Sequence, residues 1–435
     1  ADLALLMGDV GVTQAQPLPD PIATGPIPLA PVQRRLWALA AADPDDPSYN
    51  MPFSLVLCGT LRADRLRAAL VDVVARHAAL RTMLPMRDGA PLQHIIEDPG
   101  QVVGPLPMLD ATRIDVDEYV QEFISSPIDP RSEAPLRAAL VRRGDDEHLL
   151  VLVIHHIAAD GGSMPVLLTD LVEAYRQRAS GRSEPWVAGD IGYRDYALAM
   201  TEQRSDADLD HWCGVLKDVP VECTVPSIGA DSGDVGARTV TVPIDSGLRA
   251  DLIDRSRQSA TTPFSVVHAG LAILLSRMGA GRDIVVGTPV AGRADPRFRS
   301  VVGMFVNTLA LRTAVDPAMP GDELIATVRD ADLDAWDHQA VPFDEVVAAL
   351  NPMRRPGRPP LVQVMLSMHE FGAALADGAA PVADGLTMTM DELPSAAAKF
   401  DLQFTVTGLG AEAGAASVAV TYAADRYRGA DVLTL

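Results

Sequence analysis

Residues 149–161 read LLVLVIHHIAADG, an unbroken apolar run that ends in two histidines, an aspartate and a glycine. An apolar run of this length predicts a strand over Glu147–His156 that is buried on both faces of a sheet. Leu136–Val141 predicts a neighbouring strand, joined to it by the turn Gly144-Asp145-Asp146. A helical apolar periodicity over 166–175 follows the loop, so the histidines stand where a buried strand passes through a loop into a helix.

That junction holds a side chain rigidly and exposes it at the end of the sheet. A neutral imidazole there can take a proton from an amine or a hydroxyl near neutral pH. Asp160 is close enough to orient the loop or a ring, and Gly161 lets the backbone approach a ligand. The alternative is a core histidine beside a capping aspartate. Two adjacent histidines with Asp-Gly favour a catalytic centre made of His155, His156, Asp160 and Gly161.

The chain of 435 residues predicts two lobes, each with its own core. The same α/β alternation returns in the second half, where a helix over Pro263–Met278 precedes strands at Asp283–Gly287, Leu361–Ser367, Leu402–Val406 and Ser417–Tyr422. We therefore expect an α/β fold with two similar lobes, a cleft between them, and a boundary in the polar stretch Gln177–Glu184. The predicted units are a tail and linker over 1–27, an N-terminal lobe over 28–180 and a C-terminal lobe over 181–435.

The composition excludes several classes of function. With 48% hydrophobic and 22% charged residues the chain is globular, and its net charge of −22 disfavours nucleic acid as a partner. Three scattered cysteines (Cys58, Cys213 and Cys223) predict neither a disulfide framework nor a metal site, and fit the cytoplasm. The apolar runs are too short to predict a membrane span. Lysine occurs only at positions 217 and 399, which we interpret as genomic bias towards arginine.

Seven motifs, the histidine run and six others in order along the chain, resemble one family. HHIAADG matches the HHxxxDG signature of the condensation domains of nonribosomal peptide synthetases. The other motifs lie at Leu29–Trp37, Arg76–Thr82, Tyr193–Tyr196, Val302–Thr308, His338–Asp344 and Pro360–Val364. The chain departs from the family pattern at Ala78, Gly162, Ala340 and Gly357, and none of these departures removes a residue of the signature.

The resemblance implies two lobes similar to chloramphenicol acetyltransferase, set in a V-shaped pseudo-dimer with a central tunnel. It implies amide-bond formation between a donor acyl or peptidyl thioester and an acceptor aminoacyl thioester. Each thioester would arrive on the phosphopantetheine arm of a carrier domain, so the domain itself would bind no cofactor and no metal. An upstream donor carrier, whose last helix would end at Asp2–Met7, a downstream acceptor carrier and an adjacent adenylation domain are the partners it implies.

The resemblance also assigns roles to single residues. His156 would lie closest to the chemistry, as a general base or as a donor to the tetrahedral intermediate. Asp160 would be structural and paired with an arginine, for which Arg293 is the first candidate and Arg81 the second. Asn307 and Gly162 are placed on the tunnel wall.

Other functions of the same fold stay open at this stage. An epimerisation domain shares the histidine motif, but the run His338-Gln-Ala-Val-Pro-Phe343 favours condensation. A non-catalytic recruitment domain usually has a degraded histidine motif, whereas this motif is intact. The cyclisation subtype carries aspartates in place of the histidines, and acyltransferases that use coenzyme A carry a DFGWG motif that this sequence lacks.

Overall fold

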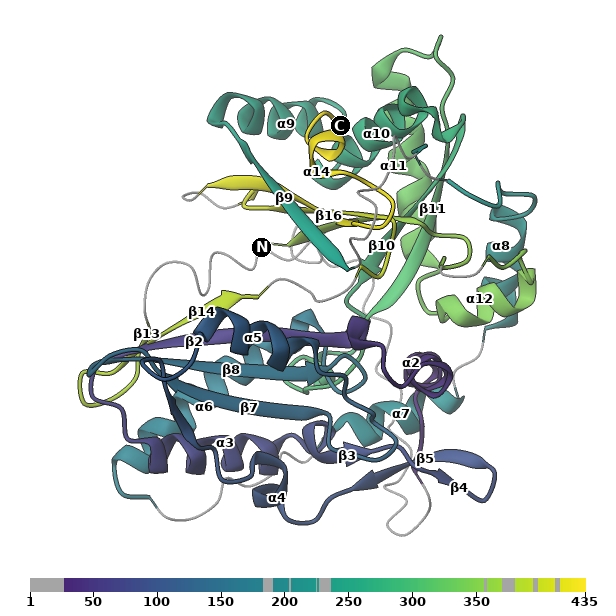
Figure 1. Cartoon of the computed structure of the whole chain (residues 1–435). Helices are drawn as coiled ribbons and strands as arrows, with labels where there is room; N and C mark the ends of the chain where they lie inside the picture. The colour runs from purple at the N-terminus through teal and green to yellow at the C-terminus, as the bar shows by residue number, and fades with distance from the viewer. Residues whose placement is uncertain are drawn as a thin grey trace.

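The computed structural model describes residues 27–182, 191–202, 205–223, 225–226, 236–355, 358–369, 380–393, 398–410 and 415–435. These residues form two lobes, each built on one large sheet with helices packed against it (Figure 1). The predicted tail at Asp2–Met7 and part of the predicted polar boundary, residues 183–190, lie outside the described residues.

The N-terminal lobe contains a sheet in which six described strands run in the order β13-β14-β2-β8-β7-β6. Its strands are β2 (Asn50–Cys58), β6 (Met108–Asp110), β7 (Leu136–Arg142), β8 (Glu147–His155), β13 (Ala380–Pro381) and β14 (Thr387–Glu392). Its helices are α2 (Pro31–Ala42), α3 (Ala63–Arg76), α4 (Pro99–Val103), α5 (Val116–Ser125), α6 (Met164–Ala179) and α7 (Tyr193–Glu202). Four short strands, β1 (Ile27–Pro28), β3 (Thr82–Met83), β4 (Met86–Arg87) and β5 (Ala90–Ile95), form a small sheet beside it.

The C-terminal lobe contains the second sheet, whose six described strands run in the order β11-β10-β12-β15-β16-β9. Its strands are β9 (Ala237–Ile244), β10 (Asp283–Val290), β11 (Asn307–Ala314), β12 (Val364–His369), β15 (Leu402–Thr407) and β16 (Ala416–Ala423). Its helices are α8 (Asp206–Val215), α9 (Ser246–Gln258), α10 (Pro263–Leu275), α11 (Gly321–Asp337), α12 (Phe343–Leu350) and α14 (Gly429–Val432).

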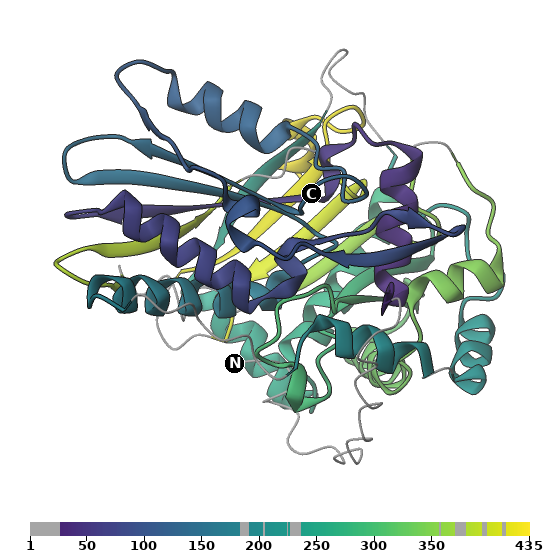
Figure 2. The ribbon, with the colours of Figure 1, turned by 90° about the horizontal axis from the view of Figure 1, so that it is seen from below.

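Strand β8 is buried on both faces, as the apolar run predicts. Leu150, Leu152 and Ile154 pack in the core beneath the sheet, whereas Leu149, Val151 and Val153 pack on the opposite face with residues of α5. Helices α3 and α6 lie side by side under the sheet (Figure 2). Burial of each of these aliphatic side chains stabilises the fold by about 1.5–3 kcal/mol, so β8 is a fixed support for the residues that follow it.

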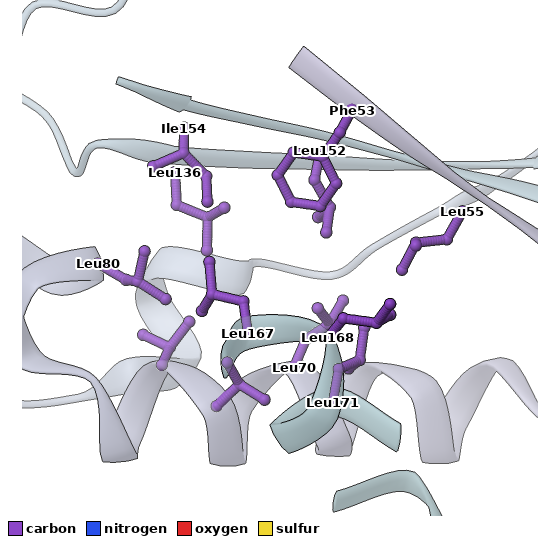
Figure 3. A pocket seen from close by; sticks show the side chains of 12 residues that line it. Phe53, Leu55, Leu70, Leu80, Leu136, Leu152, Ile154, Leu167, Leu168 and Leu171 are labelled. Atoms are coloured by element: carbon purple, nitrogen blue, oxygen red, sulfur yellow. The ribbon is translucent and has the colours of Figure 1, made fainter. Parts of the chain in front are cut away.

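A small void remains between β8 and helices α3 and α6 (Figure 3). Its volume is about 30 Å³, and it is lined by aliphatic and aromatic side chains that include Phe53, Leu70, Leu152 and Leu168. A void of this size and apolar lining is a packing defect of the core, because a substrate would need a larger space with polar groups.

One strand crosses between the lobes. Strand β14, from the C-terminal part of the chain, pairs antiparallel with β2, and Thr387 lies opposite Cys58 (Figure 1). Nearby, the guanidinium of Arg176 in α6 donates from Nε to the carbonyl of Val382 at 2.9 Å. The division into 28–180 and 181–435 stays a proposal. Under that division β14 would belong to the C-terminal lobe, although it pairs with a strand of the N-terminal sheet.

Among the described residues, one helical stretch, Pro263–Ala280, is long and apolar enough to cross a membrane. The core helix of a soluble protein has the same length and composition, so this stretch is weak evidence for a membrane span. Phe264, Leu271, Ala272 and Leu275 of the stretch are buried in the core of the C-terminal lobe.

Candidate active site

Strand β8 ends at His155, whose side chain is almost completely buried. Its Nδ1 accepts a hydrogen bond from the amide of Ile157 at 3.1 Å, so the ring proton is on Nε2. Burial, reinforced by the positive charge of Lys399, lowers the pKa of His155 to about 4. His155 is therefore a neutral side chain that holds the start of the loop.

His156 is oriented by the same loop. Its Nδ1 is 2.9 Å from the carbonyl oxygen of Ala159, which can only accept, so Nδ1 carries the proton and Nε2 keeps its lone pair. The backbone amide of His156 donates to the carbonyl of Tyr49 at 2.8 Å, which ties the loop to the residue just before β2. Burial and then the charge of Lys399 lower the pKa of His156 to about 3. The ring is thus a neutral hydrogen-bond acceptor at Nε2.

Asp160 is the structural centre of the loop, and its exposed fraction is 0%. Its Oδ1 accepts hydrogen bonds from the amide and the hydroxyl of Ser163, at 3.0 and 2.8 Å. Its Oδ2 accepts from the amide of Phe305 at 3.0 Å. Asp160 caps the short helical turn Gly161–Ser163 that leads into α6. Gly161 opens that turn, directly beside the carboxylate.

Arg293 is the arginine that pairs with Asp160. Its Nη1 donates to Oδ2 and its Nη2 to Oδ1, both at 2.7 Å. Its guanidinium also lies over the ring of Phe305, 4.1 Å from the ring centroid. The second candidate, Arg81, is wrong, because its Nη1 donates instead to the carbonyl of Ile96 at 2.6 Å, next to the small sheet.

Gly162 lies against the ion pair. A Cβ atom at this position would be 2.6 Å from Nη1 of Arg293 and 3.6 Å from Oδ1 of Asp160. A side chain at this position would therefore displace the guanidinium of Arg293 from its present place. The placement of Gly162 on the tunnel wall stays a prediction.

Asn307, at the start of β11, uses both ends of its side-chain amide to hold a neighbouring loop. Its Nδ2 donates to the carbonyls of Gln339 and Val341 at 3.0 and 2.7 Å, and its Oδ1 accepts from the amide of Phe343 at 3.0 Å. These contacts give Asn307 a structural role that the tunnel interpretation did not include. No donor or acceptor of the amide is left over for a substrate except a second lone pair on Oδ1.

Two residues of the site were missed as individual candidates. Gln33, buried at the start of α2, donates from Nε2 to the carbonyl of Ile157 at 3.1 Å and so braces the histidine loop. Gln33 belongs to the motif at Leu29–Trp37, and this motif was the feature of the sequence that could have identified it.

Lys399 is the second missed residue. It is attributed above to genomic bias, and the structure places it near the histidines. Its ammonium lies 5.5 Å from the centroid of the Tyr49 ring, and that ring is 6.4 Å from the ring of His155. Burial and the nearby charge of Arg35 lower the pKa of Lys399 to about 8. Among the described residues, no carboxylate forms an ion pair with Lys399. The feature of the sequence that could have identified it is the rarity of lysine in this arginine-rich chain.

Comparison with known proteins agrees with this geometry. A family model described as "Condensation domain" matches residues 23–435. The chain is 37% identical over 412 residues, 92% of its length, to a probable non-canonical nonribosomal peptide synthetase, CymA, of Salinispora arenicola, and spans 5% of that protein. It is 39% identical over 360 residues, 79% of its length, to the isonitrile lipopeptide synthase of Mycobacterium tuberculosis, and spans 14% of that protein.

A solved structure shows the same fold. The X-domain from teicoplanin biosynthesis, in its complex with OxyB, is 28% identical and superposes with a TM-score of 0.84 over 98% of this chain and 94% of its own. The expected α/β fold with two lobes of the chloramphenicol acetyltransferase type is confirmed. The family model, the relatives and the fold together show that the chain belongs to the condensation-domain family of nonribosomal peptide synthetases.

Proposed function

We propose that the chain forms an amide bond between a donor acyl or peptidyl thioester and the amine of an acceptor aminoacyl thioester. Both substrates are carried on phosphopantetheine arms of carrier domains, one upstream and one downstream, beside an adenylation domain in a cytoplasmic synthetase. The observation that carries the proposal is the fixed orientation of His156, whose protonated Nδ1 is held by Ala159 and whose Nε2 lone pair is left for a substrate.

The reaction needs little acid–base chemistry, because the thioester is already activated. The amine nitrogen attacks the carbonyl carbon, the C–N bond forms, the C–S bond breaks, and the amine proton ends on the sulfur of the departing thiol. Alignment of two tethered reactants supplies a large part of the acceleration. Nε2 of His156 accepts a hydrogen bond from the amine and directs the nitrogen lone pair at the carbonyl.

The low pKa of His156 favours one of its two suggested roles. With a pKa of about 3, only roughly one ring in ten thousand is protonated at pH 7, so the resting ring accepts a hydrogen bond and does not donate one from Nε2. Stabilisation of the developing negative charge then falls to a different group. Lys399 carries a positive charge next to the histidine loop, and we assign this role to it.

A single-turnover assay with loaded donor and acceptor carriers tests the proposal. We expect amide product from the wild-type chain and a loss of about 10²–10⁴-fold in rate for His156→Ala. His94→Ala, which removes an exposed histidine from β5, is the matched control and keeps the wild-type rate. An undiminished rate in folded His156→Ala would remove His156 from the mechanism.

A second candidate function is recruitment of a partner protein without catalysis. The likeness to the teicoplanin X-domain, solved in complex with OxyB, favours it. The intact arrangement of His156, Asp160 and Arg293 favours catalysis. Absence of amide product with every carrier pair tried, together with stable binding of a partner protein, would select recruitment.

A further inference from the structure

Tyr49 lies between the groups to which the reaction is assigned, although no step of the mechanism uses it. Its backbone carbonyl accepts the hydrogen bond from the amide of His156 at 2.8 Å. The centroid of its ring is 6.4 Å from that of the His155 ring and 5.5 Å from the ammonium of Lys399. One residue therefore contacts both the histidine loop and the cation to which we assign the stabilisation of negative charge.

The backbone of Tyr49 is held from both sides along the chain. Tyr49 ends the short helical turn Pro47–Tyr49, in which the amide of Ser48 donates to Oδ1 of Asp46 at 2.9 Å. The next residue, Asn50, begins β2 and donates from Nδ2 to two backbone carbonyls, at 3.0 and 2.8 Å. A capped turn that leads directly into a buried strand leaves the ring a fixed point of attachment.

The hydroxyl end of the ring lies near a cation that contacts the other lobe. Burial raises the pKa of the Tyr49 hydroxyl, and the charge of Arg35 opposes this effect. Nε of Arg35 is 3.5 Å from Oδ1 of Asp344 in α12. The guanidinium of Arg35 also lies over the ring of Phe343, 5.7 Å from its centroid. The ring of Tyr49 is thus confined by both lobes.

An aromatic face is a suitable support for a cation that must act on a substrate. A lysine ammonium sits on a long flexible stem, so a fixed position costs side-chain entropy that some contact must offset. A carboxylate would hold the ammonium but would also neutralise its charge. The face of an aromatic ring attracts the ammonium and leaves the net charge in place. The charge then still acts on an anion that develops nearby.

We propose that Tyr49 is a positioning residue for amide-bond formation, because the face of its ring holds the ammonium of Lys399 beside the histidine loop. The inference rests on the proposed function, since it uses the role assigned there to Lys399. Tyr49 lies outside the seven motifs of the sequence, so none of them marks it.

A double-mutant cycle on the single-turnover rate tests whether Tyr49 acts through Lys399. Tyr49→Leu removes the aromatic face and should lower the rate by about 2–30-fold, the range that corresponds to one cation–π contact. Tyr49→Phe keeps the face and should recover most of this loss. In a chain that already carries Lys399→Met, Tyr49→Leu should cause no further loss. An equal loss in both backgrounds overturns the proposal.

Labelling of the lysines gives a readout that needs no amide product. The chain has two lysines, so acetic anhydride and mass spectrometry follow Lys399 with the exposed Lys217 as an internal reference. The pH dependence of labelling reports the pKa of Lys399, which is lowered to about 8 by burial. In Tyr49→Leu the released ammonium reaches solvent, so this pKa should rise towards its ordinary value of 10.5. An unchanged or lower pKa would show that Lys399 stays in place without the ring, and overturns the proposal.

A matched control separates this effect from the general loss of a ring. Tyr119→Leu removes a half-exposed tyrosine of α5 that stacks on Phe123, and it should change neither the rate nor the labelling of Lys399. The same changes in this control as in Tyr49→Leu would count against a specific role for Tyr49. If the wild type forms no amide product, the proposed function fails, and the labelling still decides whether the ring holds Lys399.

Discussion

Asp160 and Arg293 form a two-pronged ion pair, with both N–O distances at 2.7 Å, between the loop after β8 and the loop after β10. The exposed fractions of the two side chains are 0% and 8%, so the pair is removed from water. Removal of two charges from water is costly, and it is offset here because Asp160 also accepts hydrogen bonds from Ser163 and Phe305. The loop that carries His156 thereby depends on contacts made by the other lobe.

The first prediction concerns this ion pair. Arg293→Ala leaves the carboxylate of Asp160 buried without its partner, which should lower the free energy of unfolding by about 3–5 kcal/mol and abolish product formation. Arg297→Ala removes the partly exposed partner of Asp295 and should cost at most about 1 kcal/mol. Urea denaturation measures both, and equal effects would show that burial of the Asp160 pair is unimportant.

The second prediction concerns Gly162. Gly162→Ala places a methyl group against Nη1 of Arg293 and should lower the free energy of unfolding by about 1–3 kcal/mol. The rate of condensation should fall equally for small and large donors, since the disturbed contact is the ion pair. Gly144→Ala is the matched control, because its new Cβ meets only Glu147 at 4.0 Å. A loss confined to large donors would contradict this cause and support the predicted place of Gly162 on the tunnel wall.

The third prediction concerns Lys399. Lys399→Met removes the charge beside the histidine loop and should lower the single-turnover rate by about 10²-fold at pH 7. Lys399→Arg keeps a charge that does not titrate. With a pKa of about 8, Lys399 loses its proton as the pH rises from 7 to 9, so the rate of the wild type relative to Lys399→Arg should fall across this range. A constant ratio contradicts a role for the charge.

The fourth prediction is a loss of stability in acid. The pKa values of His155 and His156 are lowered to about 4 and 3 in the folded chain, whereas an unfolded histidine has its ordinary value of 6.5. Below pH 6.5 the unfolded state therefore binds more protons, and the free energy of unfolding falls as the pH falls. Each ring contributes up to about 1.4 kcal/mol per pH unit between roughly 6 and its folded pKa. Denaturant unfolding of the wild type and of His156→Gln at pH 7, 6 and 5 measures this. The free energy of unfolding should depend less steeply on pH in the variant, and an equal pH dependence would show that protonation of His156 is not the cause.

The parts of the site that could be predicted from sequence are those with a local pattern. The apolar run fixes β8 on both faces, and the histidines follow it directly, so their place at the strand end needs no tertiary information. The pairing of Asp160 with an arginine was also predicted, as an implication of the family resemblance, and a buried charge does require a partner. The choice of Arg293 over Arg81 depended on which loop the other lobe brings to the site.

The remaining features depend on contacts between distant segments. Asn307 lies in a motif that predicts a functional residue. Its three hydrogen bonds go to a loop that is distant in the sequence, so they could not be predicted from the sequence. Lys399 carries no periodic or motif signal, and its place near His155 depends on a contact with Tyr49, which is far away in the sequence. Strand β14 could not be assigned to the N-terminal sheet, because the residue pattern of a strand does not identify the strand with which it pairs.

The pairing of β14 with β2 also determines how such a domain can be cut and recombined. A fragment that ends near residue 180 lacks residues 387–392, and the edge of β2 over 53–58 then has unpaired backbone groups. An open, apolar strand edge is a template for aggregation. Chimeras of this protein that exchange one lobe should therefore carry residues 380–393 together with the N-terminal lobe, although they lie far beyond it in the chain.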